Sequence, residues 1–164
     1  MFEDIEYETM AKPEPQELSA FYTRQGHHEA AQSREKLKRM ISHTHCFVTA
    51  RCKGELIGFA RGVTDGFGGR LAECKLDPTF QGPGCITRKD GRIEHDSAGI
   101  AHEMACRVIG VLRQSGVDRI VALAHGTEVD FCEELGFRKL RGLVALELTN
   151  DIPLPARELA QSAV

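Results

Sequence analysis

The sequence lacks any apolar run that approaches the roughly 18 residues needed to cross a bilayer. Its first residues, Met1-Phe2-Glu3-Asp4-Ile5-Glu6, are acidic and lack the hydrophobic region of a signal peptide. The formal net charge of -3 gives no electrostatic case for binding nucleic acid or an acidic membrane. We therefore expect a protein of the reducing cytoplasm, with neither nucleic acid nor membrane among its partners.

The six cysteines include no C-x-x-C pair, which excludes a thioredoxin-type motif and a zinc knuckle. In a reducing compartment they are expected to be free thiols. The segment His43-Thr44-His45-Cys46 contains residue types that bind zinc, but its spacing matches no common zinc site. We therefore predict no metal centre.

The sequence shows no internal repeat, low-complexity segment or interdomain linker. A chain of 164 residues fits one domain. Folding at this length buries roughly 70% of the surface of the unfolded chain, which is enough for a hydrophobic core. We expect a single domain over residues 1–149 and a polar tail over residues 150–164.

The first half of the chain predicts one strand, two helices and a three-stranded antiparallel meander. The strand covers residues 5–10, the helices cover 13–25 and 33–41, and the meander strands cover 47–52, 56–63 and 71–76. Pro13 and Pro15 suit a helix start, because proline is tolerated in the first turn. Lys53-Gly54 is a hairpin turn between the first two meander strands.

The second half alternates helices and strands, which makes the fold class mixed α/β. The clearest helical period covers residues 97–115, and Asp96 or Ser97 can cap this helix. Residues 119–124 include few polar side chains and suit a strand that is covered on both faces. A short helix then ends at Gly136, and a last strand is predicted over residues 143–148.

Three motifs occur in an order that is typical of one enzyme superfamily. Residues 131–137 read F-C-E-E-L-G-F, residues 47–61 contain F-V-T-A-R and G-F-A-R, and residues 76–84 read L-D-P-T-F-Q-G-P-G. In these motifs the sequence resembles the GNAT N-acetyltransferase superfamily over residues 4–148. The resemblance implies a mostly antiparallel central sheet of about six to seven strands with helices on both faces. It also implies acetyl-CoA as co-substrate and an amine as acceptor.

The superfamily's pyrophosphate motif, Q/R-x-x-G-x-G/A, is split in this sequence. Residues 81–86 match its first part, and residues 96–101 match its second part but begin with Asp96 where Gln or Arg is expected. Only the second copy opens a helix, whose N-terminal amides and partial positive charge favour an anion. The predicted pyrophosphate site is formed by the backbone amides of Gly99, Ile100, Ala101 and His102. Residues 81–84 are the alternative site, or a turn.

The resemblance also implies where the rest of acetyl-CoA binds. The backbone of Cys74 and Leu76 would pair with the pantetheine, in a cleft between two strands. His125 follows the strand predicted at residues 119–124. It would bind the cofactor or replace the superfamily's catalytic tyrosine, and the alternative is a loop histidine with no role. Ala101→Glu is then expected to abolish acetyl-CoA binding without unfolding the protein.

Two residues are candidates for the chemistry, which needs a deprotonated amine and a proton for the leaving thiolate. Glu73 is the predicted base, and the alternative is a surface carboxylate paired with Arg70 or Lys75. Cys132 occupies the position at which the superfamily often has a tyrosine that protonates the leaving thiolate. The alternative to this acid role is that Cys132 is a small buried residue on a helix face. A thiol has an ordinary pKa of about 8.5, so it could donate the proton.

Two further regions have open roles in acceptor recognition. Phe21, Tyr22 and Arg24 either line the acceptor side or belong to the core. Residues 85–95 read as a hairpin around Lys89-Asp90-Gly91. This hairpin would cover the entrance of the cleft, with Arg88 and Arg92 available to an anionic group, or else form a plain surface or a homodimer contact.

The predicted function is transfer of acetyl from acetyl-CoA to a primary amine of a small molecule or protein by direct attack. The alternative is a degenerate binding or regulatory module of the same fold that transfers no acetyl group. Three departures from the superfamily pattern support that alternative: Cys132, the interrupted loop and Asp96.

Overall fold

The structure, a computed structural model, describes residues 4–31, 33–83 and 90–153. Ten helices and strands follow one another in the described part of the chain: β1 (Ile5–Thr9), α1 (Pro15–Arg24), α2 (His28–Ala31), α3 (Arg34–His43), β2 (Cys46–Cys52), β3 (Glu55–Thr64), β4 (Gly69–Leu76), α4 (Ile100–Gln114), β5 (Ile120–Ala122) and α5 (Val129–Glu134). Single 3-10 turns at Pro78–Phe80 and Gly126–Glu128 precede α4 and α5.

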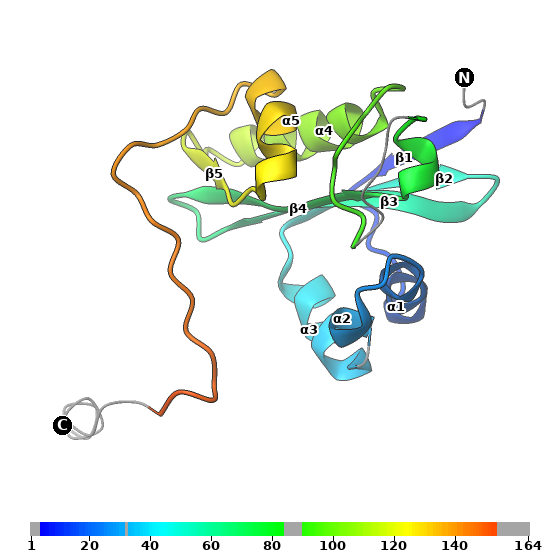
Figure 1. The fold of residues 1–164 in the computed structure, drawn as a ribbon, viewed down its shortest axis with the longest axis horizontal. Helices are drawn as coiled ribbons and strands as arrows, with labels where there is room; N and C mark the ends of the chain where they lie inside the picture. Colours follow the sequence, from blue (N-terminus) through cyan, green and yellow to red (C-terminus); the bar gives the residue numbers. More distant parts are fainter. Residues whose placement is uncertain (1–3, 32, 84–89, 154–164) are drawn as a thin grey trace.

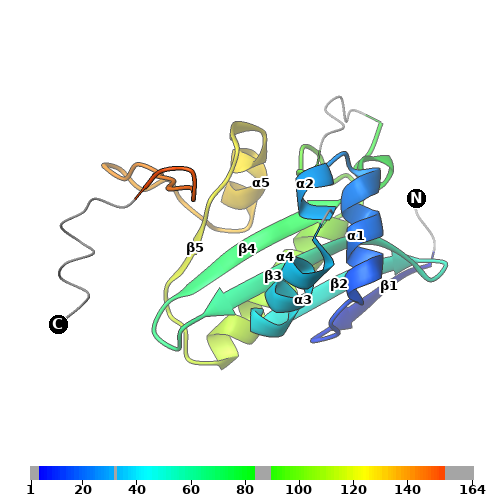
Figure 2. The ribbon, with the colours of Figure 1, turned by 90° about the horizontal axis from the view of Figure 1, so that it is seen from below.

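The described strands form one sheet in the order β1-β2-β3-β4-β5. The first four strands are antiparallel, and β5 pairs parallel to β4. Helices α1, α2 and α3 lie on one face of the sheet, and α4 and α5 lie on the other (Figures 1 and 2). The predicted mixed α/β class and the helices on both faces are confirmed, although the sheet has five strands in the described residues instead of six to seven.

Each face of the sheet has its own core. The side chains of Leu18, Phe21 and Leu37 from α1 and α3 pack with Phe47 and Phe59 of the sheet. The α4 face is larger and holds the apolar stripe that the sequence places at every fourth residue of α4: Ile100, Met104, Val108 and Leu112 are all fully or nearly fully buried there. The period of 3.6 residues therefore fixes which side of α4 meets the sheet.

A β-bulge in β4 sets the direction of the side chains near the middle of the sheet. Arg61 of β3 is opposite Glu73, and Gly62 is opposite Leu71, so Ala72 is an extra residue in β4. In a regular strand, residues 71 and 73 would point to the same face. The bulge turns them apart: Leu71 joins the core under α4, and the Glu73 carboxylate reaches Tyr22 of α1 on the other face.

Two strand predictions in the second half are wrong. Residues 143–148 form no strand and are exposed, and β5 has three residues instead of the six predicted at 119–124. β5 is also not covered on both faces, because Val121 is exposed. Both errors have the same physical cause: β5 is the edge of the described sheet, and the apolar segment predicted as the last strand does not lie against it.

Gly58 of β3 packs tightly against β4 and α4. A Cβ atom at this position would lie 2.8 Å from the Lys75 carbonyl oxygen and 3.0 Å from the Met104 side chain. Because a backbone atom cannot move aside cheaply, we expect Gly58→Ala to lower the free energy of unfolding by about 1–3 kcal/mol in urea denaturation. The control is Gly110→Ala on α4, where a Cβ atom meets nothing within 4 Å. This change should raise stability by up to about 1 kcal/mol, and equal effects of the two would contradict the packing account.

Candidate active site

A cavity of about 120 Å³ opens where β4 and β5 separate. The two strands pair only at residues 69–71 of β4. Beyond that point, β4 and the segment after β5 form two walls, and α5 forms the third: Leu71, Ala72, Glu73, Cys74, Lys75, Ala122, Leu123, His125, Glu128, Phe131 and Cys132 line the cavity. A single water needs about 10–15 Å³ by a similar measure, so the cavity has room for a small acyl group. The structure thus brings four predicted site residues together: Glu73, Cys74, His125 and Cys132.

Glu73 is held by two donors from different elements. Arg61 Nε donates to Glu73 Oε1 at 2.7 Å, and the Tyr22 hydroxyl lies 3.1 and 2.9 Å from Oε1 and Oε2. The side chains of Glu73 and Arg61 are only 18% and 15% exposed. A carboxylate can accept about four hydrogen bonds, so Oε2 retains capacity for a water or a substrate N–H group. The ion-pair partner is therefore Arg61, and neither Arg70 nor Lys75 is among the described contacts of Glu73.

Tyr22 is a core residue with one polar function. Its ring is buried and makes edge-to-face contacts with Phe21, His27 and Phe59. Burial and then the nearby Glu73 carboxylate raise the pKa of Tyr22 far above its ordinary value. The hydroxyl thus keeps its proton near neutral pH and donates a hydrogen bond to Glu73. The alternative predicted for Phe21 and Tyr22, membership of the core, matches their burial, whereas Arg24 lies at the surface beside Glu55.

Arg61 is not among the site residues predicted from the sequence. The signal that could have found it is the hairpin register of β3 and β4, which places it opposite Glu73. That register follows from the bulge at Ala72, and no residue pattern in the β4 sequence marks the bulge.

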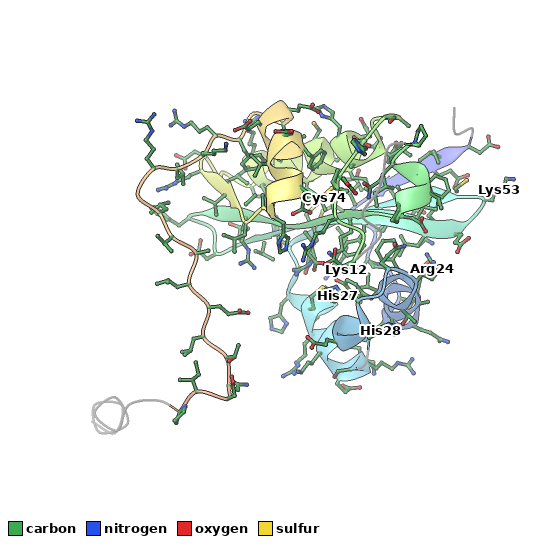
Figure 3. The ribbon with its side chains drawn as sticks, viewed as in Figure 1. Lys12, Arg24, His27, His28, Lys53 and Cys74 are labelled. Atoms are coloured by element: carbon green, nitrogen blue, oxygen red, sulfur yellow. The ribbon has the colours of Figure 1, made fainter. Side chains whose placement is uncertain are left out.

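Two cysteines line the cavity from opposite walls. Cys74 lies on β4, on the α4 side of the sheet, with its Sγ 3.7 Å from the Ala101 carbonyl oxygen (Figure 3). Cys132 lies on α5. Burial raises the pKa of Cys74 and Cys132 above the ordinary value, and the Glu128 carboxylate adds to the effect at Cys132. Both groups are therefore protonated thiols near neutral pH. The five described cysteines are free, as predicted for those positions.

Asp96 caps the N-terminus of α4. Its two carboxylate oxygens accept hydrogen bonds from the Ala101 and His102 amides, at 2.9 and 2.8 Å. Gly99 precedes the helix with a φ of 71°, a value that glycine adopts without strain. One of the two predicted caps is thus Asp96. The Gly99 amide also donates, to the Asp96 backbone carbonyl at 3.0 Å. Three of the four amides predicted to hold the pyrophosphate are therefore engaged by Asp96.

The side chains at this helix start differ in exposure. Ile100 and Ala101 are buried in the core under α4, and His102 is exposed. Ala101→Glu would place a carboxylate in that core, which costs several kcal/mol in stability. The expectation that this variant keeps its fold is therefore wrong, and the pyrophosphate site needs another test.

The described part of the 85–95 insertion packs against the molecule without forming a strand. The Leu76 amide donates to the Gly91 carbonyl at 3.0 Å, and the Asp90 amide donates to the Gln25 carbonyl at 2.6 Å. The Leu76 amide is therefore engaged and does not face a ligand. Arg92 forms an ion pair with Asp90. Residues 85–89, with Arg88 and Lys89 among them, lie outside the described residues.

Gln81 anchors this segment from within. Its side chain is fully buried, donates to the carbonyls of Leu76 and Arg92, and accepts from the amides of Glu94 and His95. Four hydrogen bonds exhaust most of what a glutamine side chain can make. Gln81 thus holds the loop before α4 in place.

The remaining predicted residue, His125, is exposed at the rim of the cavity. Its backbone amide donates to Glu128 Oε2 at 3.1 Å, which ties the start of the turn before α5 to the cavity wall. In the part of the chain that the structure describes, no group of three or more His, Cys, Asp or Glu side chains could hold a metal ion. Among the described helices, none combines the length and the apolar composition of a bilayer span.

Comparison with known proteins gives the fold. No protein-family model matches the sequence, and neither does any curated protein. Solved structures do match in shape. A GNAT-family acetyltransferase from Streptococcus pneumoniae is 17% identical with a TM-score of 0.68, covering 90% of this chain and 98% of its own. A probable acetyltransferase from meticillin-resistant Staphylococcus aureus is 12% identical with a TM-score of 0.70, covering 89% and 99%.

An aminoglycoside N-acetyltransferase in complex with CoA is 13% identical with a TM-score of 0.63, covering 88% of this chain and 95% of its own. The similarity to these structures covers nearly the whole length of both chains. Sequence identities this low show a shared fold only. The chain has the fold of the GNAT acetyltransferases.

Proposed function

We propose that this protein transfers an acetyl group from acetyl-CoA to a primary amine of a small molecule or protein by direct attack. One observation carries the proposal: Glu73, Cys74 and Cys132 line one cavity between β4 and β5, with the Glu73 carboxylate held by Arg61 and Tyr22 on the α1 side of the sheet and both thiols protonated. The shared fold supports it, since the similar structures include an N-acetyltransferase with bound CoA.

Glu73 is the proposed base. An amine attacks only in its neutral form, so a proton must leave it before or during attack. Tyr22 and Arg61 fix the orientation of the carboxylate and leave acceptor capacity on Oε2. Glu73, Glu128 and Lys75 line the cavity, and Glu73 is paired with Arg61, so the lining charges do not by themselves select a cationic amine. The proton passes to Glu73 directly or through a water.

The proposed path of acetyl-CoA runs from the α4 N-terminus along β4 into the cavity. The thioester lies near Cys74. This residue lines the cavity, and its Sγ contacts the Ala101 carbonyl in the first turn of α4, so the cavity and the helix start are adjacent. The pyrophosphate sits at the amides of Gly99 to His102, where the helix N-terminus favours negative charge. For this to happen, the Asp96 side chain must leave the Ala101 and His102 amides, and the Asp96 carbonyl must release the Gly99 amide.

Cys132 is the proposed proton donor to the departing thiolate. Burial raises the pKa of Cys132 above that of an ordinary thiol, so Cys132 is a weaker acid than an exposed cysteine. Its main contribution to the proton transfer is therefore its position. We expect Cys132→Ala to lower kcat by about tenfold, below the usual range of about 100 to 10,000-fold for a general acid. Cys132→Tyr should be tolerated and restore or exceed wild-type kcat, because the phenol reaches further. Steady-state thiol release measures both variants, and full activity of the alanine variant would remove the thiol from the mechanism.

The proposed function is tested by a screen of amines for thiol release from acetyl-CoA. Aminoglycosides, polyamines, amino acids and lysine peptides cover the acceptor classes, and a thiol reagent detects free CoA. We expect at least one amine to raise the release rate above that of the enzyme with acetyl-CoA alone. Mass spectrometry should find the acceptor heavier by one acetyl group. Acetyl-CoA binding without turnover on any amine would contradict the proposal.

A further inference from the structure

An exposed apolar segment follows the last helix of the fold. Residues 138–153, here called the C-terminal arm, contain no helix or strand and run away from the sheet as an extended chain (Figures 1 and 3). The side chains of Val144, Leu146 and Leu148 are 79%, 91% and 67% exposed, and Leu143 is also exposed to solvent. Apolar side chains gathered on an exposed segment indicate a surface that another molecule covers.

The sheet has an unpartnered edge of matching character. In the described residues, β5 pairs with β4 on one side and with no strand on the other. Val121 is 37% exposed and Leu123 is 73% exposed, although the composition of residues 119–124 is that of a buried strand. An open apolar edge presents free N–H and C=O groups that can add a strand.

The arm has the composition of that missing strand. Alternate residues Val144, Leu146 and Leu148 would share one face of a strand, and Leu143, Ala145 and Glu147 the other. One chain thus carries both an open strand edge and an unpaired strand-like segment. Figure 1 shows the arm running away from its own β5.

We propose that the C-terminal arm adds as a strand to β5 of a second copy of this chain, and that two copies exchange arms in a symmetric dimer. Fully extended, the 16 residues of the arm (138–153) span about 50 Å, more than the roughly 35 Å diameter of a body of this size. The arm can therefore reach the edge of a neighbouring molecule. An exchange of this kind closes with two identical contacts, as a two-fold dimer requires.

The exchange also completes the site. Leu123 lines the cavity and is mostly exposed in the single chain. An arm seated along β5 passes beside Leu123, so the partner's arm forms the outer wall at this end of the cavity. This consequence rests on the contact alone and not on the proposed acetyl transfer.

The first test is the mass of the protein in solution, measured by size-exclusion chromatography with light scattering. The wild type should be a dimer. Val144→Asp combined with Leu146→Asp should give a monomer, because two carboxylates would enter the contact. The matched control is Ile152→Asp, an equally polar change at another exposed position of the arm, which should remain a dimer. Truncation after residue 139 repeats the test if the double variant fails to fold.

The second test identifies the contact as an exchange. Val121→Asp changes the edge of β5 and should also give a monomer. Mixed in equal amounts, the edge variant and the arm double variant should form a heterodimer in native mass spectrometry, because one intact arm then meets one intact edge. A monomeric wild type, a dimer that survives loss of the arm, or failure of the two variants to complement would each overturn the proposal.

Discussion

Glu73→Gln is expected to lower kcat by about 100 to 10,000-fold, with little change in the KM for acetyl-CoA. The amide keeps the size of the side chain and can still accept from Arg61 and Tyr22, but it cannot take a proton from the attacking amine. The measurement is steady-state thiol release across the pH range over which the folded variant is stable.

The control for this variant is Arg61→Gln, which breaks the same ion pair but leaves the carboxylate in place. Loss of one partner of a partly buried pair destabilises a protein, so both variants are also compared by urea denaturation. If Glu73 is the base, kcat falls much further in Glu73→Gln than in Arg61→Gln. Equal losses in the two variants would assign Glu73 to the ion pair alone.

Asp96→Asn should tighten acetyl-CoA binding by about tenfold, or about 1.4 kcal/mol. In the structure, the Asp96 carboxylate occupies the Ala101 and His102 amides that the pyrophosphate would need. The single side-chain oxygen of asparagine can accept one of the two amides, so one cap bond is kept and the other amide is released. Asparagine carries no charge, so it competes less with the phosphates and does not repel them. Calorimetric titration measures the change, which should shrink at high salt.

A matched control exists elsewhere in the chain. Asp65 also accepts two backbone amides, those of Phe67 and Gly68, in the turn between β3 and β4. Asp65→Asn removes the same charge without touching α4, so acetyl-CoA affinity should stay the same. Unchanged or weaker binding by Asp96→Asn would place the pyrophosphate away from these amides. Residues 81–84 then become the alternative, with the restriction that the Gln81 side chain is already committed to four hydrogen bonds.

Much of the fold follows from local patterns in the sequence. The period of α4, the Lys53-Gly54 turn and Gly136 after α5 each have one physical interpretation, and the structure has these elements at the predicted places. The first nine predicted elements are present in the predicted order, with the short α2 in addition. The tenth, predicted as a strand at residues 143–148, forms only where another strand pairs with this apolar segment. Whether such a partner is present depends on contacts between distant segments or between molecules, which the local sequence pattern does not reveal.

The candidate site was predictable only in part. Motif positions brought Glu73, Cys74, His125 and Cys132 to attention, and all four line one cavity. The partners that decide what these groups can do were not predictable. Arg61 lies opposite Glu73 because a bulge shifts the register of β4. The Asp96 carboxylate accepts from amides that are five and six residues further along the chain. Both contacts depend on backbone geometry that single residue types do not reveal.

Titration of the wild-type protein with acetyl-CoA, followed by its unfolding, tests the central claim most directly. The claim is that the space between β4 and β5 and the start of α4 together bind acetyl-CoA. Calorimetry should show saturable binding with one site per chain. At 100 times Kd, the ligand should raise the free energy of unfolding by about 2.7 kcal/mol. An absence of both heat and stabilisation at millimolar acetyl-CoA would contradict the claim.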